Sequence, residues 1–240
     1  MSAQMDRLKK TLKDFFAEKS STSKIMEAFE PGKPLDRRLF AIYLIETFHY
    51  TRHNARNQAA VAINHVDLDI RYMKYCLKHA HEEAGHEMMA FHDLKSLGYK
   101  GTVEKLPEPL PQTQTLIGYL YHVSKTGNPL ARLGYSFWAE RSYQYIEPML
   151  GAIRDEFGIK KGGMTFFDEH SDIDTKHAAE VEEVIERTCK TDEDWKAIED
   201  CMIMSLKLTG LMMKTVYEEF LLLQQGKSDR YAFLNESIQK

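Results

Sequence analysis

The stretch HSDIDTKH places two histidines and an aspartate, His170, Asp174 and His177, at spacings of four and three residues. On an α-helix these three positions fall on one stripe about two turns long. Imidazole and carboxylate groups together are ligands typical of iron, zinc or manganese sites. Apolar residues such as Phe167 and Val181 run beside the stripe, and burying its polar groups without a partner would be costly. The pattern therefore predicts a metal site that faces the interior of a helical protein.

A second stretch, HAHEEAGHE, repeats the same spacing with His79, Glu83 and His86. Helical bundles that hold two irons use a Glu-x-x-His pair of the kind formed by Glu83 and His86. This pair alone is weak support, because it arises often by chance. Glu82 and His79 lie on nearly the same face, as alternative ligands or as hydrogen-bond partners of the ligands. His81 lies farther round the helix and is expected to face solvent.

A third segment, YSFWAERSYQY, surrounds Glu140 with aromatic residues. A carboxylate in such surroundings is costly to ionise unless it is paired or bound to a metal. Glu140 is therefore a candidate ligand, with a salt bridge to Arg141 or another basic residue as the alternative. His49 and His53 lie four residues apart in ETFHYTRH and could supply a fourth ligand helix or line a substrate pocket. Neither role is fixed by the sequence.

Helical periodicity extends over most of the chain, without the alternating runs and hairpin turns that predict strands. We expect an all-α protein in which residues 1–240 form a single compact bundle of seven or eight helices, with a polar tail from about residue 227. The expected loops are 20–34 and 101–111, the second with three prolines. The expected helices are 5–16, 36–64, 67–97, 113–125, 129–157, 164–189 and 191–225. Asp36, Asp67 and a capping box of Thr191 with Asp194 are expected at the starts of three of them.

The composition excludes several classes of function. The net charge of −4, with acids and bases interleaved, argues against a nucleic-acid partner. No apolar run reaches the length of a membrane helix, and the first residues lack the apolar core of a signal peptide, so we expect a cytoplasmic protein with no membrane partner. The cysteines Cys76, Cys189 and Cys201 are scattered, which argues against disulfides and a thiolate zinc site.

With these motifs in hand, the chain resembles the haem-oxygenase-like di-iron oxidases and oxygenases. Their all-helical fold is shared with thiaminase-like and pyrroloquinoline-quinone-synthase-like proteins. The resemblance covers about residues 35–226. It implies a metal site built from EEAGH, FWAER and HSDIDTKH, which supply Glu83, His86, Glu140, His170, Asp174 and His177. Some members place the first glutamate seven residues before the histidine, but position 79 here is a histidine, which leaves the ligand from the first motif open.

The resemblance also implies the reaction class. Members bind two ferrous ions, which such sites can partly lose, and use dioxygen to oxidise or fragment a small carboxylic acid, amino acid or amine. The expected partners are thus a small-molecule substrate and dioxygen, with a homodimer as one option. The alternatives are a thiaminase-like hydrolase, for which Cys76 could be the nucleophile, a metal-free oxidase, and a non-enzymatic helical interaction protein. The sequence does not identify the substrate or a catalytic residue.

Overall fold

The computed structural model describes residues 2–30, 32–160 and 162–238, except for the side chains of residues 19–22 and 169–175. Within these ranges all regular structure is helical, which confirms the predicted class. The helices are α1 Ala3–Thr22, α2 Lys24–Ala28, α3 Arg37–Thr51, α4 Asn54–Asn64, α5 Ile70–Glu82, α6 Glu87–Ser96, α7 Pro111–Lys125, α8 Leu133–Ala139, α9 Tyr143–Phe157, α10 Thr165–Thr188, α11 Asp192–Gln224 and α12 Leu234–Ser237, with a 3₁₀ turn, η1, at Val103–Lys105.

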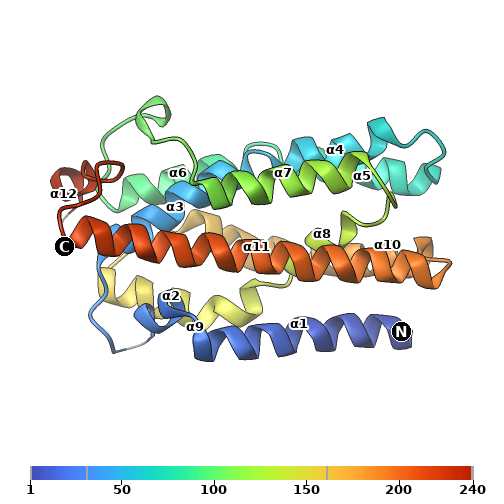
Figure 1. Cartoon of the computed structure of the whole chain (residues 1–240), viewed down its shortest axis with the longest axis horizontal. Helices are drawn as coiled ribbons and strands as arrows, with labels where there is room; N and C mark the ends of the chain where they lie inside the picture. Colours follow the sequence, from blue (N-terminus) through green and yellow to red (C-terminus); the bar gives the residue numbers. More distant parts are fainter. Residues whose placement is uncertain (1, 31, 161, 239–240) are drawn as a thin grey trace.

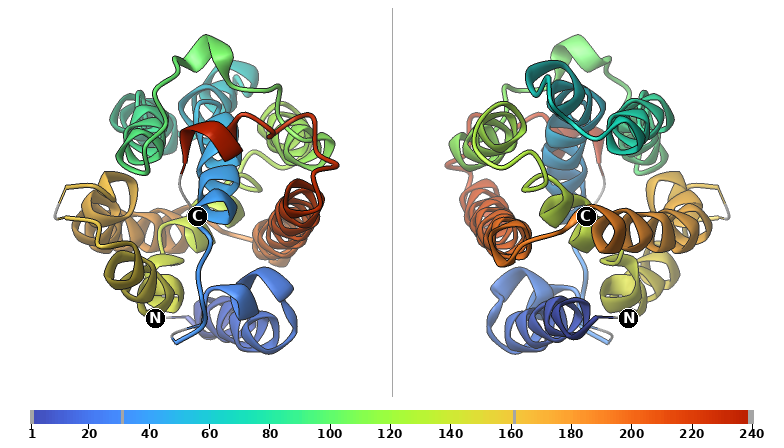
Figure 2. Two further views of the ribbon diagram at one scale, coloured as in Figure 1. Left: turned by 90° about the vertical axis from the view of Figure 1, so that its left-hand side faces the viewer. Right: turned by 90° about the vertical axis from the view of Figure 1, so that its right-hand side faces the viewer.

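Helix α11 runs the length of the molecule and organises the bundle around it (Figure 1). It packs against α8, α7 and α3. Helices α4 to α7 lie on one side of α11, whereas α1, α2 and α9 lie on the other, as both end views also show (Figure 2). Among the described residues, each helix is too short or too polar to cross a lipid bilayer.

Side-chain caps set several helix starts where the sequence predicts them. Asp36 accepts a hydrogen bond from the backbone N–H of Arg38 at the start of α3. Thr191 and Asp194 form a complete capping box before α11, as predicted. The prediction that Asp67 caps the next helix is wrong, because Asp69 accepts the first backbone N–H groups of α5 instead.

Three of the long helices expected from the sequence are interrupted. The 36–64 segment breaks at residues 52–53, the 67–97 segment at 83–86, and the 129–157 segment starts only at Leu133 and breaks at 140–142. At the second break Gly85 has a φ of +100°, a left-handed conformation that glycine adopts without strain. The expected loop 20–34 is also partly helical, since it contains the end of α1 and all of α2.

The apolar core has two parts. One gathers side chains of α2, α3, α6 and α9 with the chain's C-terminal segment, and the other gathers side chains of α1, α5, α7, α8 and the first half of α11. A cavity lies where the two parts meet, because Phe166 and Phe167 of the first part and Tyr135 and Trp138 of the second part line it together. The broken helices surround this cavity.

Candidate metal centre

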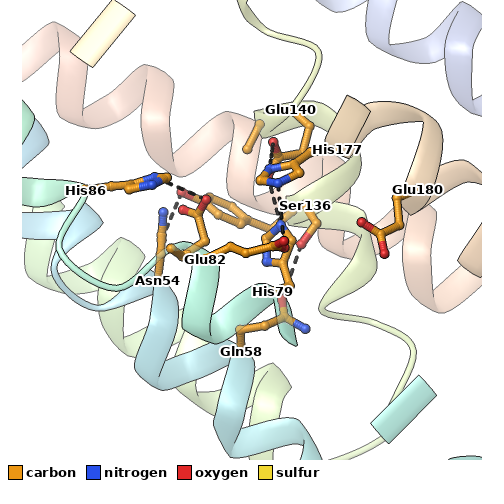
Figure 3. A network of polar contacts seen from close by, with 12 residues as sticks. Asn54, Gln58, His79, Glu82, His86, Ser136, Glu140, His177 and Glu180 are labelled. Carbon is orange, nitrogen blue, oxygen red and sulfur yellow. Dashed lines mark hydrogen bonds and ion pairs between the residues drawn. The ribbon is translucent and has the colours of Figure 1, made fainter. Parts of the chain in front are cut away.

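Four buried side chains from three segments meet at the cavity. His79 lies on the last turn of α5, Glu83 directly follows α5, Glu140 directly follows α8, and His177 lies in the middle of α10. One nitrogen or oxygen from each of them lies within 4.8 Å of the corresponding atoms of the others. Figure 3 shows the Glu140, His177 and His79 side chains directed toward one another. Residues almost a hundred positions apart thus form one polar cluster inside an apolar bundle.

Glu140 is held between two imidazoles. Its Oε1 lies 3.2 Å from Nε2 of His79, and its Oε2 lies 3.4 Å from Nδ1 of His177. The two imidazole rings are 5.3 Å apart between centroids. The carboxylate therefore bridges α5 and α10 from the end of α8.

The charges in this cluster depend on one another. Burial alone raises the pKa of Glu140, but the contacts with His177 and His79 outweigh burial and bring the pKa to about 2. The same Glu140 contact raises the pKa of His177 against the opposing effect of burial. Without a metal, the site thus holds an anionic carboxylate beside an imidazole that retains a proton more readily than usual.

The donor set fits a divalent transition metal. Two imidazoles and two carboxylates are the ligands that iron, manganese and zinc share. The buried Nδ1 of His79 has no hydrogen-bond partner within the described part of the structure, and such a nitrogen is costly to leave without one. A metal would satisfy it or the opposite ring nitrogen, because metal-bound histidines normally use one nitrogen for the metal and one for a second partner.

The structure brings three of the six predicted ligands, Glu83, Glu140 and His177, into the cluster. His86 adjoins it, with Nδ1 3.3 Å from Oε1 of Glu83, and lines the same cavity. Burial raises the pKa of Glu83, but the hydrogen bond from His86 and the charge of His79 lower it below its usual value.

The other two predicted ligands, His170 and Asp174, have side chains outside the described part of the structure, so their ligand role stays a prediction. Their backbone belongs to the regular helix α10, seven and three residues before His177.

His79 is a full member of the cluster, whereas the sequence left it as an alternative to Glu83. The two residues are one helical turn apart, so both reach the same face even though α5 ends between them. Glu82, the other alternative, lies at the edge, with Oε2 3.7 Å from Nε2 of His177. His81 is exposed, as predicted. Arg141 pairs with Glu182, so among the described side chains the basic residues that contact Glu140 are His79 and His177 and not Arg141.

The histidines of α3 and the following turn lie outside the cluster. Nε2 of His49 lies 2.8 Å from the backbone oxygen of Pro107, and Nδ1 of His53 lies 3.1 Å from the hydroxyl of Tyr121. Both contacts attach this region to α7 and the loop before it. The structure thus gives no support to a fourth ligand helix.

The cavity beside the cluster, called the inner cavity below, has a volume of about 90 Å³. Of the aromatic residues that surround Glu140 in the sequence, Tyr135, Trp138 and Tyr143 line this cavity. Tyr145 instead stacks on Phe16, with ring centroids 4.4 Å apart. Seven of the residues that line the cavity are tyrosine, tryptophan or phenylalanine, and their rings limit the room for water beside the polar cluster.

The cysteines have a different environment. Cys76, Cys189 and Cys201 are all buried as free thiols. Burial raises the pKa of Cys76 to about 11, so this thiol stays protonated near neutral pH. Cys76 thus lacks the activation that a nucleophilic cysteine requires.

Comparisons with known proteins agree with this arrangement. Residues 41–210, more than half of the chain, match the model of a family described as iron-containing redox enzymes with a haem-oxygenase-like fold. A crystal structure of a domain of unknown function with a heme oxygenase-like fold from Shewanella denitrificans is 44% identical, with a TM-score of 0.91 over 95% of this chain and 98% of that one.

More distant structures share the fold alone. A TenA homologue from P. horikoshii is 15% identical, with a TM-score of 0.71 over 90% of this chain and 98% of that one. A TenA family transcription regulator from Silicibacter sp. is 10% identical, with a TM-score of 0.69 over 90% and 96% of the two chains. A search of functionally curated proteins gives no match.

The structural matches confirm the all-helical, haem-oxygenase-like architecture that the sequence predicts. The family match extends from α3 into α11 and includes each segment that contributes to the polar cluster. The chain therefore belongs to the haem-oxygenase-like family of iron-containing redox enzymes.

Proposed function

We propose that this protein is a non-haem di-iron oxidoreductase that uses dioxygen to oxidise or fragment a small carboxylic acid, amino acid or amine. The observation that supports this most directly is the buried cluster of His79, Glu83, Glu140 and His177, whose donor atoms converge within 4.8 Å. A set of two imidazoles and two carboxylates suits iron and leaves coordination positions open for small molecules. Membership of a family of iron-containing redox enzymes supports the same assignment.

In this proposal the four clustered side chains hold one iron. His86, which contacts Glu83, is the first candidate ligand for the second iron. His170 and Asp174 complete the set as predicted from the sequence. Bound iron supplies the one-electron chemistry that lets dioxygen react with an organic substrate.

The protein's own groups prepare the site for metal. The lowered pKa of Glu140 keeps this carboxylate ionised over the physiological range. The raised pKa of His177 means that a proton must leave its imidazole before the nitrogen can bind a metal. Iron affinity should therefore rise as the pH increases through neutrality. The aromatic side chains around the inner cavity keep bulk water away from the cluster.

The decisive experiment measures metal content and dioxygen consumption together. The full chain, reconstituted with ferrous iron without oxygen, should hold close to two irons and consume dioxygen once it is admitted. Glu140→Gln keeps the side-chain shape but weakens the central carboxylate, so it should lower both values. The proposal fails if carefully reconstituted protein holds no transition metal. Retention of zinc with hydrolytic activity would instead indicate a metal-dependent hydrolase.

The alternatives have less support. A thiaminase-like hydrolase would need a reactive thiol, and the buried Cys76 with its raised pKa does not provide one. Cys76→Ser should therefore leave activity nearly unchanged. If the protein were a metal-free oxidase or an interaction protein, the close approach of the buried histidines and carboxylates would have no function.

A further inference from the structure

One buried cation, Arg132, has no role in the proposed metal chemistry. It directly precedes α8 and is 1% exposed, although its guanidinium is charged at any physiological pH. Its Nε donates to Oδ1 of Asn57 at 2.7 Å, and its Nη1 donates to Oγ of Ser136 at 2.9 Å. The guanidinium carbon lies 4.4 Å from the centroid of the Tyr135 ring. These contacts hold the cation in one position.

The hydrogen-bond partners of Arg132 are neutral. No carboxylate among the described side chains forms an ion pair with it, and its acceptors are an amide and a hydroxyl oxygen. A buried guanidinium usually pairs with a carboxylate, because an uncompensated buried charge is costly. Arg38 follows this rule: it is 5% exposed, and its Nη2 lies 2.6 Å from Oδ2 of Asp36. The two buried arginines therefore differ in whether an anion compensates their charge.

Residue type, and not lack of space, keeps an anion away from Arg132. Asn57 on α4 is completely buried, and its Nδ2 has no hydrogen-bond partner within the described residues. An aspartate has the same shape and would offer Nε of Arg132 a charged acceptor in place of a neutral one. It would also remove an amide N–H group that is costly to bury unpaired. The amide at position 57 thus leaves Arg132 with its full positive charge.

Arg132 and the carboxylates of the cluster line the same inner cavity. Arg132 and Glu140 directly precede and follow α8, so at about 1.5 Å per residue they lie about 12 Å apart along the helix. Burial raises the pKa of Tyr135 to about 12, and Arg132 opposes this rise. Glu83 and Glu140 add to the rise. The charge of Arg132 therefore acts across the same buried region as the charges of the cluster.

We propose that Arg132 is a fixed positive charge that opposes charge on the metal at the cluster and so favours ferrous over ferric iron there. A nearby cation opposes a metal charge of +3 more strongly than a charge of +2. Across about 12 Å, at an effective dielectric constant of about 20, one unit of charge shifts an equilibrium by about tenfold. This inference rests on the proposed function for the presence of iron. The shift holds the resting site in the ferrous form, from which iron reacts with dioxygen.

Two substitutions remove the uncompensated charge in different ways. Arg132→Gln deletes the guanidinium, whereas Asn57→Asp keeps it and places a carboxylate against its Nε. Asn57→Asp preserves the shape of the side chain, so it should fold even if Arg132→Gln does not. Arg132→Lys keeps the charge with fewer hydrogen bonds. Arg38→Gln is the matched control, because Arg38 is also buried but pairs with Asp36 and does not line the inner cavity.

The first measurement is the ferric–ferrous reduction potential of the iron-loaded full chain, from anaerobic titration with dithionite as reductant and ferricyanide as oxidant. Arg132→Gln and Asn57→Asp should each shift the equilibrium about tenfold toward ferric iron, which lowers the potential by about 59 mV for a one-electron couple. Arg132→Lys and Arg38→Gln should keep the potential of the unmodified protein. An unchanged potential in Asn57→Asp would overturn the proposal, as would a shift of equal size in Arg38→Gln.

The second measurement is the affinity of the full chain for Zn²⁺, by competition with a chelating dye, and it involves no redox chemistry. Asn57→Asp should raise this affinity by about tenfold or more, because a metal charge of +2 is then no longer opposed. If Arg132 served only to hold α8 in place, Asn57→Asp would leave zinc affinity unchanged, and the proposal would be wrong. A chain that shows the rise with zinc but binds no iron would refute the proposed function and leave the charge effect of Arg132 standing. Iron binding with an unchanged potential would have the opposite meaning.

Discussion

Two buried glutamates, Glu46 and Glu140, have opposite kinds of surroundings. The Glu46 carboxylate accepts hydrogen bonds from the backbone N–H of Leu110 at 3.0 Å, the hydroxyl of Thr113 at 2.5 Å and the hydroxyl of Tyr231 at 2.8 Å. These donors come from the start of α7 and from the C-terminal segment. Glu140 instead lies between two imidazoles, each able to bind a metal.

The two pKa values reflect this difference. Burial raises the pKa of Glu46, and its hydrogen bonds offset only part of that effect. For Glu140 the two histidines more than offset burial and lower the pKa to about 2. A buried carboxylate satisfied by neutral donors connects elements of the fold, whereas one surrounded by imidazoles forms a site for a cation. Hydrogen-bond partners separate the two roles where burial alone does not.

The largest expected effect comes from removing an imidazole of the Glu140 cluster. His177→Ala and His79→Ala should each lower iron affinity by about 100-fold or more, because each removes one of the proposed metal ligands. Dioxygen uptake should then be abolished. Iron analysis after dialysis and an oxygen electrode measure both effects. His81→Ala is the matched control, since this exposed histidine on the same helix should have almost no effect. Equal losses in His81→Ala and His79→Ala would contradict the assignment.

For Glu46 we expect a loss of stability without a loss of iron. Glu46→Ala leaves the donors of Leu110, Thr113 and Tyr231 without their acceptor, at a cost of about 1 kcal/mol for each. The free energy of unfolding should fall by about 3 kcal/mol, while iron content per folded chain stays the same. Urea denaturation and iron analysis of the same sample measure the two quantities. Loss of iron at full stability would show that Glu46 belongs to the metal site.

Asp93 is a third buried carboxylate, and we expect it to make the stability of the protein depend on pH. It accepts hydrogen bonds from the backbone N–H groups of Thr165 and Phe166 and so caps α10, the helix that carries His177. Burial raises the pKa of Asp93 to about 6, against these hydrogen bonds. The unfolded value is about 3.9, so the folded state binds this proton more tightly and stability declines as the pH rises between about 4 and 6.

Comparing the stability of the unmodified protein with that of the Asp93→Asn variant isolates the contribution of the Asp93 carboxyl group. The unfolding free energy of the unmodified protein, relative to the variant, should fall by at most about 3 kcal/mol over that pH range. Denaturation in urea at a series of pH values measures the difference. A relative stability that is flat, or that rises with pH, would contradict the raised pKa.

The smallest expected effect concerns the break between α5 and α6. Gly85→Ala places a side chain at a φ of +100°, which costs about 1 kcal/mol even though a Cβ there meets nothing within 4 Å. Because Gly85 lies between Glu83 and His86, iron affinity should also fall slightly. Thermal unfolding and iron titration measure this. Gly118→Ala, in a regular helix, should instead stabilise the protein by up to about 1 kcal/mol.

Much of the fold follows from the sequence alone. Period-3.6 apolar patterns and the capping box of Thr191 and Asp194 set where helices form, because these signals depend on residues only a few positions apart. The same local reasoning identified Glu83, Glu140 and His177, since their types and spacing are visible without a structure. Local periodicity does not reveal the helix breaks, because an amphipathic pattern continues across a turn as well as along a helix.

The tertiary structure decided how these residues combine. The breaks after α5 and α8 place Glu83 and Glu140 at helix ends, where the carboxylates meet His177 of α10. His79 joined the cluster because Glu140, sixty-one positions away in the chain, approaches its ring within 3.2 Å. The inner cavity likewise depends on the packing of α3, α5, α8 and α10 around the cluster. Residue types and local spacing determine which groups can bind a metal, but only long-range packing determines which of them face one another, since that choice depends on contacts between segments far apart in the chain.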